Sequence, residues 1–238
     1  HTNSEIVLDN SLYQNFYNVN MLYPFYDIEL HWSKSSLDLS LINKSLSKKK
    51  FIIGPLWVKK KLVTKSKDNL NISFFTSKYG TTGAVNSINS HIKFLEFIFE
   101  ICKKFPTNNY YLKPKYDFDN IDIFDLNLLN IANDLKNLSN LKIISDDLST
   151  DIIKKSDLVI SMPFVSSNMQ AMSMNVYSVY LDLMSHYPNN IFCNYKNFYV
   201  NSKENFFEIY DSFLNKSCND RSIENQCLLE DFIGSGNF

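Results

Sequence analysis

The chain has 238 residues, of which 45% are hydrophobic and 21% charged, and its formal net charge at pH 7 is −1. That balance is typical of a folded globular protein, and it gives no electrostatic reason to expect binding to nucleic acid or to anionic membranes. Arg221 is the single arginine, so lysine, hydroxyl or backbone N–H groups would have to hold any phosphate.

The sequence also gives no support for a membrane-spanning protein or for a metal-binding protein. No apolar run reaches the ~18 residues that a membrane-spanning helix needs. The four cysteines form no C-x-x-C pair and have no histidine at metal-ligand spacing, so we predict free thiols and neither a metal nor another cofactor. The chain also lacks the glycine-rich phosphate loops and the G-x-S-x-G nucleophile motif.

The first elements along the chain are short. Residues 26–30 are predicted to form a strand, residues 35–46 a helix, and residues 51–53 a second strand that Gly54-Pro55 ends.

A polar and basic stretch without periodicity, residues 59–70, is typical of a linker between domains. We therefore expect residues 1–58 to be the remnant or end of an N-terminal acceptor lobe. Residues 71–238 are expected to form a C-terminal domain that binds the substrate.

Strands and helices alternate regularly in this second domain. We predict strands at residues 71–77, 110–112, 141–144, 157–162 and 176–183, and helices at residues 90–105, 124–138, 148–155, 168–174 and 202–214. Several of the strands are short apolar runs, which indicates burial on both faces of the sheet. The fold class expected is therefore α/β, a Rossmann-like parallel sheet with helices on both faces.

Polar residues that follow the predicted strands are candidates for a binding site, because ligands of open α/β sheets bind outside the carboxyl ends of the strands. They are Ser77 at the end of the strand at residues 71–77, Lys113 and Lys115 after the strand at 110–112, Asp146 and Asp147 after the strand at 141–144, and Ser166 and Ser167 after the strand at 157–162. The lysines could reach a phosphate or simply be solvated. The aspartates could contact a ligand or cap the next helix.

The turn after the fourth strand is the most informative of these segments. A strand, a turn with hydroxyl groups at Ser166 and Ser167, and a helix N-terminus together form an anion site, because free backbone N–H groups and the helix dipole point to one place. A diphosphate would fit such a site without arginine. The alternative is that one of the two serines only caps the helix.

Histidine is the candidate for a general base, because imidazole titrates near neutral pH. His31 directly follows the predicted strand at residues 26–30 and could act at the cleft, with a structural role as the alternative. His91, near the start of a predicted helix, and His186 have no visible partner of a catalytic triad.

The order of several short segments along the chain carries more information than any single residue in them. The segments are Ser145-Asp146-Asp147-Leu148-Ser149, Ser156-Asp157-Leu158-Val159-Ile160-Ser161, Pro163-Phe164-Val165-Ser166-Ser167, Gln170-Ala171 and Val179-Tyr180-Leu181-Asp182. In this order they resemble the C-terminal lobe of GT-B glycosyltransferases, most of all those of bacterial surface-polysaccharide synthesis. Lys113-Pro114-Lys115 is similar to a family segment that follows an earlier strand.

The resemblance implies a GT-B-like C-terminal lobe with part of an N-terminal lobe. It implies that Ser166 and Ser167 hold the diphosphate of a nucleotide-sugar donor and that Lys113 lies near the donor phosphates. Gln170 stands where the family commonly has a glutamate that contacts the ribose or the sugar, and Asn175 stands where it often has glycine.

The activity implied is metal-independent transfer of a sugar from a nucleotide-sugar donor to a glycan or lipid-linked acceptor, in the synthesis of a surface glycan. Two alternatives stay open. One is a nucleotide-sugar epimerase-like enzyme, because the same lobe occurs there, and the other is a non-catalytic Rossmann-like interaction protein that lost its acceptor lobe. The expected location is the cytoplasm, with peripheral association at the inner face of the cell membrane as the alternative.

Overall fold

The computed structural model describes residues 27–31, 48–52, 69–78, 87–116, 126–185, 192–193 and 195–233. The expected helix at residues 35–46 and nearly all of the expected linker at residues 59–70 lie outside these ranges, so the domain boundaries stay a prediction. No helix in the described ranges combines the length and hydrophobicity that crossing a membrane requires.

A small sheet contains the two strands of the first series. β1 (Ile28–His31) and β2 (Lys49–Ile52) pair in parallel, with His31 beside Ile52. Both strands were expected, and each is displaced by about two residues from its predicted position. The described side chains of this sheet are mostly exposed, and Lys48 Nζ lies 2.9 Å from Asp27 Oδ1.

A second sheet of six parallel strands has the order β5-β4-β3-β6-β7-β8. The strands are β3 (Asn71–Phe75), β4 (Asn109–Lys113), β5 (Leu141–Ile143), β6 (Leu158–Ser161), β7 (Tyr177–Leu181) and β8 (Tyr199–Val200). Every residue of β6 and β7 is buried, as expected for strands covered on both faces. The parallel α/β fold expected from the sequence is therefore confirmed.

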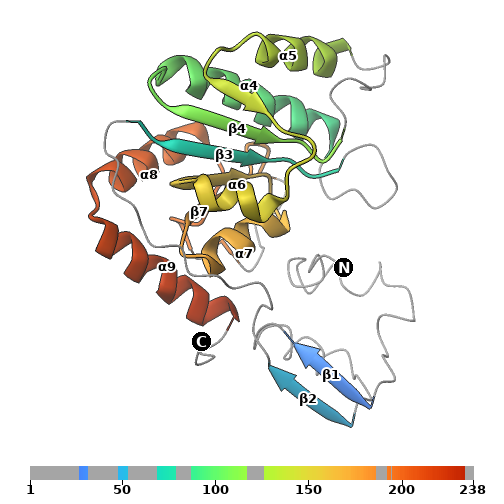
Figure 1. Cartoon of the computed structure of the whole chain (residues 1–238), viewed down its shortest axis with the longest axis vertical. Helices are drawn as coiled ribbons and strands as arrows, with labels where there is room; N and C mark the ends of the chain where they lie inside the picture. Colours follow the sequence, from blue (N-terminus) through green and yellow to red (C-terminus); the bar gives the residue numbers. More distant parts are fainter. Residues whose placement is uncertain are drawn as a thin grey trace.

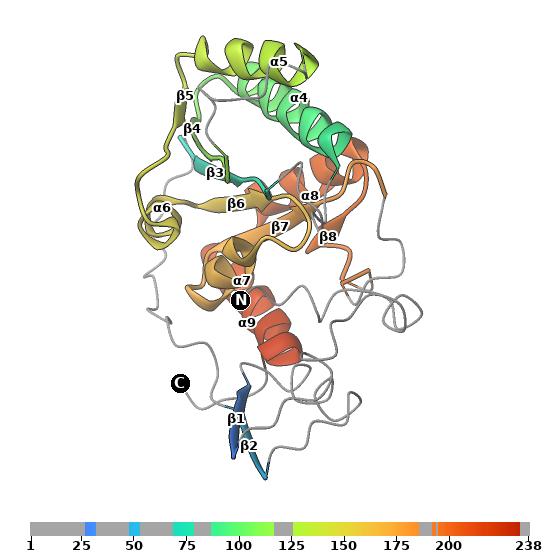
Figure 2. The same ribbon diagram turned by 90° about the vertical axis from the view of Figure 1, so that its right-hand side faces the viewer.

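Helices cover both faces of the six-stranded sheet (Figures 1 and 2). On one face lie α4 (Ile88–Lys104), α5 (Leu126–Lys136) and α8 (Lys203–Asn215), and on the other lie α6 (Ser149–Lys155), α7 (Ser166–Ser173) and α9 (Cys218–Ile233). Parallel crossovers are right-handed, so connections that step in opposite directions across the sheet place their helices on opposite faces. The chain steps one way from β3 to β5, through α4 and α5, and the other way from β5 to β7, through α6 and α7.

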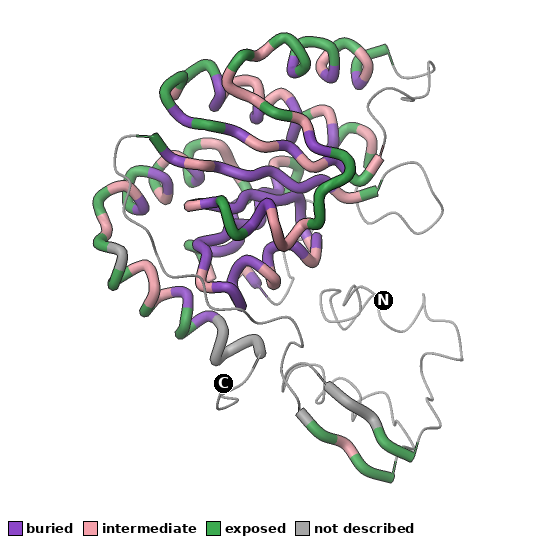
Figure 3. Tube along the Cα trace, in the orientation of Figure 1, coloured by how far each residue is buried: buried purple, intermediate pink, exposed green. Residues whose placement is uncertain are grey.

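The core lies between the central strands and these helices, where the chain is almost continuously buried (Figure 3). Phe74 of β3 stacks on Tyr110 with ring centroids 6.0 Å apart and meets Phe94 of α4 edge-on. Phe97 of α4 packs on Phe206 of α8, with ring centroids 4.9 Å apart. Each such buried aromatic ring contributes roughly 2–3 kcal/mol through the hydrophobic effect.

Three differences from the predicted elements affect the site. α7 begins at Ser166, two residues earlier than predicted, so both serines lie in its first turn. The edge strand β8 and the helix α9 were not predicted. β8 has only two residues, too few for a periodic signal, and α9 has a weakly amphipathic, polar sequence.

Candidate functional site

The order of the strands reverses between β3 and β6, which are neighbours in the sheet. In open α/β sheets, ligands bind at this switch point, outside the carboxyl ends of the strands. The backbone N–H of Met162 donates to the carbonyl of Phe75, 3.1 Å away, and the hydroxyl of Ser77 lies 3.9 Å from Met162 Sδ. The segments after β3 and β6 therefore meet at one place, whereas the grouping of Ser77 with Ser166 and Ser167 in one binding site stays a prediction.

The turn from β6 into α7 presents a helix N-terminus at this switch point. Val165 is the N-cap and makes no side-chain capping hydrogen bond, so the alternative that Ser166 or Ser167 caps the helix is wrong. Among the described residues, Asn168 N–H bonds to the Val165 carbonyl, but no such bond is formed by the N–H groups of Ser166 and Ser167. Free N–H groups in the first helical turn are suited to bind an anion.

Phe164 stands just before this turn with a φ of 67°, which is unfavourable for a residue with a bulky side chain. Its ring lies 6.2 Å from that of Tyr180 and 6.5 Å from that of Phe192, centroid to centroid. The Tyr180 hydroxyl also donates to the Val165 carbonyl at 3.0 Å. This aromatic packing holds the strained turn in place, so the N-terminus of α7 is rigidly positioned.

Two side chains in α7 contain buried polar atoms with no hydrogen-bond partner. Asn168 is fully buried, and both its Nδ2 and Oδ1 are unpartnered, as is Oε1 of Gln170. A buried polar atom left in this state costs about 1–3 kcal/mol, and it commonly marks a site for water or for a ligand. Gln170 follows Ser166 by four residues, which places the two on the same side of the helix.

Lys113 and Lys115 lie at the carboxyl end of β4, beside β3, at the same edge of the sheet. Lys113 Nζ donates to the Ser145 carbonyl at 2.6 Å and so joins the ends of β4 and β5. The backbone N–H of Lys115 donates to Thr76 Oγ1 at 2.9 Å, while its side chain is exposed. Their contact with a phosphate stays a prediction.

His91 is part of this region, although no partner for it could be recognised in the sequence. Its ring is fully buried in α4, with Nδ1 2.9 Å from the Ser87 carbonyl and Nε2 2.9 Å from the Ser77 carbonyl and 3.2 Å from Ser77 Oγ. Burial lowers the pKa of His91 and outweighs the two carbonyls, which favour the charged ring. The imidazole connects the end of the β3 segment to the start of α4.

The remaining candidates lie elsewhere or have a different role. His31 ends β1, and its side chain lies outside the described residues, so its role as a base stays a prediction. Asp146 and Asp147 are exposed, and the N-cap of α6 is Leu148 with no side-chain hydrogen bond. The interpretation of these aspartates as helix caps is therefore wrong.

Comparison with known protein families identifies the chain. The sequence profile of the family described as "Polysaccharide biosynthesis PFTS motif protein" matches residues 7–208. The chain belongs to this family. The stretch Pro163-Phe164-Val165-Ser166 matches three of the four letters of the PFTS name, and it forms the turn into α7. No protein with a curated description matches the sequence.

Several solved structures share the fold of this PFTS family chain. A Listeria monocytogenes protein assigned as a UDP-N-acetylglucosamine 2-epimerase superposes with a TM-score of 0.56 at 13% identity, over 89% of this chain and 55% of that one. S. aureus MnaA, solved with UDP, gives a TM-score of 0.54 at 10% identity, over 84% of this chain and 55% of that one. Anabaena Alr3699/HepE, in complex with UDP and glucose, gives a TM-score of 0.50 at 12% identity, over 90% of this chain and 61% of that one.

These likenesses show the fold alone, because the sequence identities are low. The chain spans little more than half the length of the first of these structures. The resemblance to the GT-B lobe of surface-polysaccharide proteins is confirmed for the family and for the fold.

Proposed function

We propose that this chain binds a nucleotide sugar and transfers the sugar to an acceptor in polysaccharide biosynthesis. The observation that supports it most is the N-terminus of α7, where Ser166 and Ser167 offer hydroxyl and backbone donors at the switch point of the sheet. This turn is also the stretch of the chain that matches the family's motif name. The fold likeness to structures solved with UDP makes a nucleoside diphosphate a natural ligand.

The proposed mechanism follows from where negative charge develops. When the bond to the sugar breaks, the diphosphate leaves with additional charge, and preorganised donors that face it lower the barrier. The dipole of α7 and the N–H groups of its first turn supply such donors. Lys113, at the end of β4, is the cation proposed to approach the phosphates, and His31 is the proposed base for the acceptor hydroxyl.

Calorimetric titration with UDP, UDP-glucose and UDP-N-acetylglucosamine tests this proposal. The double substitution Ser166→Ala, Ser167→Ala removes both hydroxyl donors and is expected to weaken binding about tenfold or more, because hydrogen bonds to charged groups are stronger than neutral ones. The exposed pair Ser139→Ala, Ser212→Ala serves as the matched control and should bind as the wild type does. Absence of binding by all three ligands, with the fold intact by circular dichroism, would contradict the proposal.

A second candidate is an epimerase acting on a nucleotide sugar, which the likeness to the Listeria monocytogenes structure supports. The two activities differ in what they require. Transfer needs an acceptor, whereas an epimerase converts UDP-N-acetylglucosamine into its isomer at C2 without one. Proton NMR of the nucleotide sugar incubated with the protein alone separates them, because only the epimerase produces signals of the isomer at C2.

A further inference from the structure

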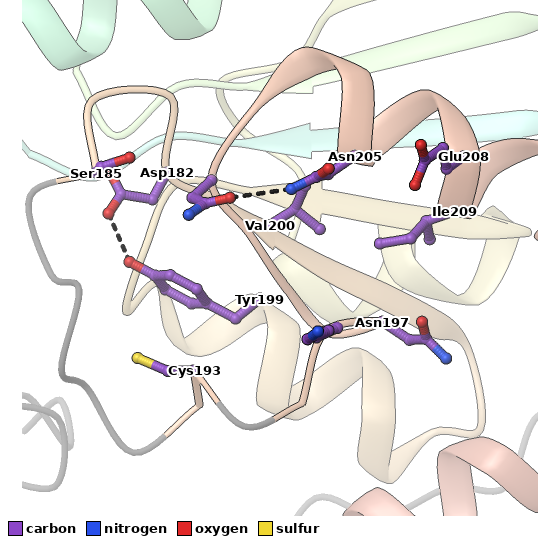
Figure 4. Close-up of a pocket in the computed structure, with 11 residues that line it drawn as sticks. Asp182, Ser185, Cys193, Asn197, Tyr199, Val200, Asn205, Glu208 and Ile209 are labelled. Atoms are coloured by element: carbon purple, nitrogen blue, oxygen red, sulfur yellow. Dashed lines mark hydrogen bonds between the residues drawn. The ribbon is translucent and has the colours of Figure 1, made fainter.

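A hollow with a volume of about 500 Å³ lies beside the edge strand β8, at the carboxyl ends of β7 and β8 (Figure 4). That volume lies within the range typical of small-molecule sites. Its walls come from the segment after β7, from the segment around β8, and from the first two turns of α8. None of the residues predicted to bind the donor lines it.

The floor of the hollow is a fixed polar pair. The carboxylate of Asp182 is nearly inaccessible to solvent, and the buried Tyr199 donates its hydroxyl to Asp182 Oδ2 at 2.6 Å. The backbone N–H of Asp182 donates to the Val200 carbonyl at 2.7 Å, which ties the end of β7 to the edge strand. Figure 4 shows Tyr199 directed toward Asp182 across this side of the hollow.

The rim carries amide side chains. Asn205 Nδ2 donates to Asn201 Oδ1 at 3.2 Å, and both residues are exposed. Asn197 is exposed as well and is oriented by a hydrogen bond to Glu224 of α9. Glu208 projects from α8 on the same side of the hollow as Ile209 (Figure 4).

This combination of groups selects a class of ligand. Amides donate and accept hydrogen bonds, and carboxylates accept from hydroxyl groups, so together they match the alternating donors and acceptors of a sugar. Among the described residues that line the hollow, Asp182 and Glu208 outnumber the one cation, Lys196, which disfavours a phosphate or another anion. Val200 and Ile209 supply a small apolar surface for the C–H groups of a sugar ring.

We propose that this hollow binds one or two neutral sugar units of a glycan, separately from the nucleotide sugar at α7. The identity of that glycan as the acceptor rests on the proposed function, but its binding does not. β8 lies two strands from β6 in the sheet. At about 5 Å per strand, the hollow is roughly 10 Å from the switch point, so a glycan held here lies within a few sugar units of the donor.

Saturation-transfer NMR on the whole chain tests this assignment, with glucose, galactose, N-acetylglucosamine and one disaccharide of each as probes. The substitutions Asn201→Ala and Asn205→Ala together remove the amide rim and should weaken binding of the saccharide about tenfold. The matched control is Asn127→Ala with Asn130→Ala, two exposed asparagines on α5, which should leave saccharide binding unchanged. Circular dichroism checks the fold of each variant.

The possible results separate this proposal from the first. Binding of no saccharide in the panel, or equal binding by the Asn201/Asn205 variant and the wild type, would overturn the glycan site. Loss of UDP-sugar binding in that variant, with UDP binding kept, would also overturn it, since the hollow would then hold the donor's own sugar. Saccharide binding without any binding of UDP-sugars would contradict the donor site at α7 and leave the glycan site supported.

Discussion

At the scale of single residues, the site is distinguished by polar groups whose partners are missing or are shared with the backbone. The N–H groups at the start of α7, the side chain of Asn168 and Oε1 of Gln170 all lie in one eight-residue helix. Unsatisfied polar groups lower the stability of a folded protein, so their concentration in one helix indicates a functional site.

Gln170 provides a test in which stability and binding move in different directions. Replacing it by methionine, Gln170→Met, keeps the approximate volume and removes an unpartnered buried oxygen, so the melting temperature should stay the same or rise. Affinity for a UDP-sugar should fall about tenfold, because the hydrogen bond to the ligand is lost. Differential scanning fluorimetry and calorimetry measure the two effects. A lower melting temperature with unchanged affinity would show that the glutamine is structural.

His91 predicts a specific dependence of stability on pH. Its folded-state pKa is lowered, so below pH 6.5 the unfolded chain takes up a proton that the folded chain resists. The stability that His91 contributes is thus complete above pH 6.5 and declines as the pH falls below it. Urea unfolding at pH 5.5 and 7.5 should show a smaller pH difference for His91→Gln than for the wild type. An equal difference in the two proteins would contradict this assignment.

At the scale of elements, the unpredicted helix α9 holds the end of α7. Asn225 is buried in α9, and its Nδ2 donates to the Met172 carbonyl at 3.1 Å and to the Val176 carbonyl at 3.5 Å. Asn175, where the GT-B family often has glycine, adopts a φ of 58° and donates to Ser222 Oγ of α9 at 2.8 Å. Asparagine tolerates this left-handed conformation, which explains why it can replace glycine after the helix.

Removing the α9 contact should destabilise the fold measurably. Asn225→Ala leaves two buried carbonyl groups with one partner fewer, so the free energy of unfolding should fall by about 1–3 kcal/mol. Asn219→Ala, an exposed position on the same helix, is the control and should change it by less than about 0.5 kcal/mol. Equal effects in a urea titration would show that Asn225 does not connect α9 to α7.

At the scale of the whole molecule, the regular alternation of apolar strands and helices was enough to predict the parallel sheet. Ser77, Lys113 and the two serines of α7 follow or end strands whose carboxyl ends share one edge of this sheet, and their joint role in one site stays a prediction. Contacts between distant segments were not predictable. The partners of His91, Ser77 and Ser87, lie on the two sides of residues 79–86. The hollow proposed to bind a glycan is formed in part by β8, a strand of only two residues.

The prediction of two domains concerns residues 1–70 above all, most of which lie outside the described part of the chain. The small sheet of β1 and β2 agrees with two of its predicted strands. The role of His31 as a base depends on this region and stays a prediction.

The central claim is that the N-terminus of α7 binds the diphosphate of a nucleotide sugar, and backbone amide NMR tests it most directly. On titration of the ¹⁵N-labelled chain with UDP, the amide signals of Ser166 and Ser167 are expected to shift most, and titration with uridine should leave them nearly unchanged. Shifts concentrated at another edge of the sheet, or equal shifts with uridine and UDP, would contradict the account.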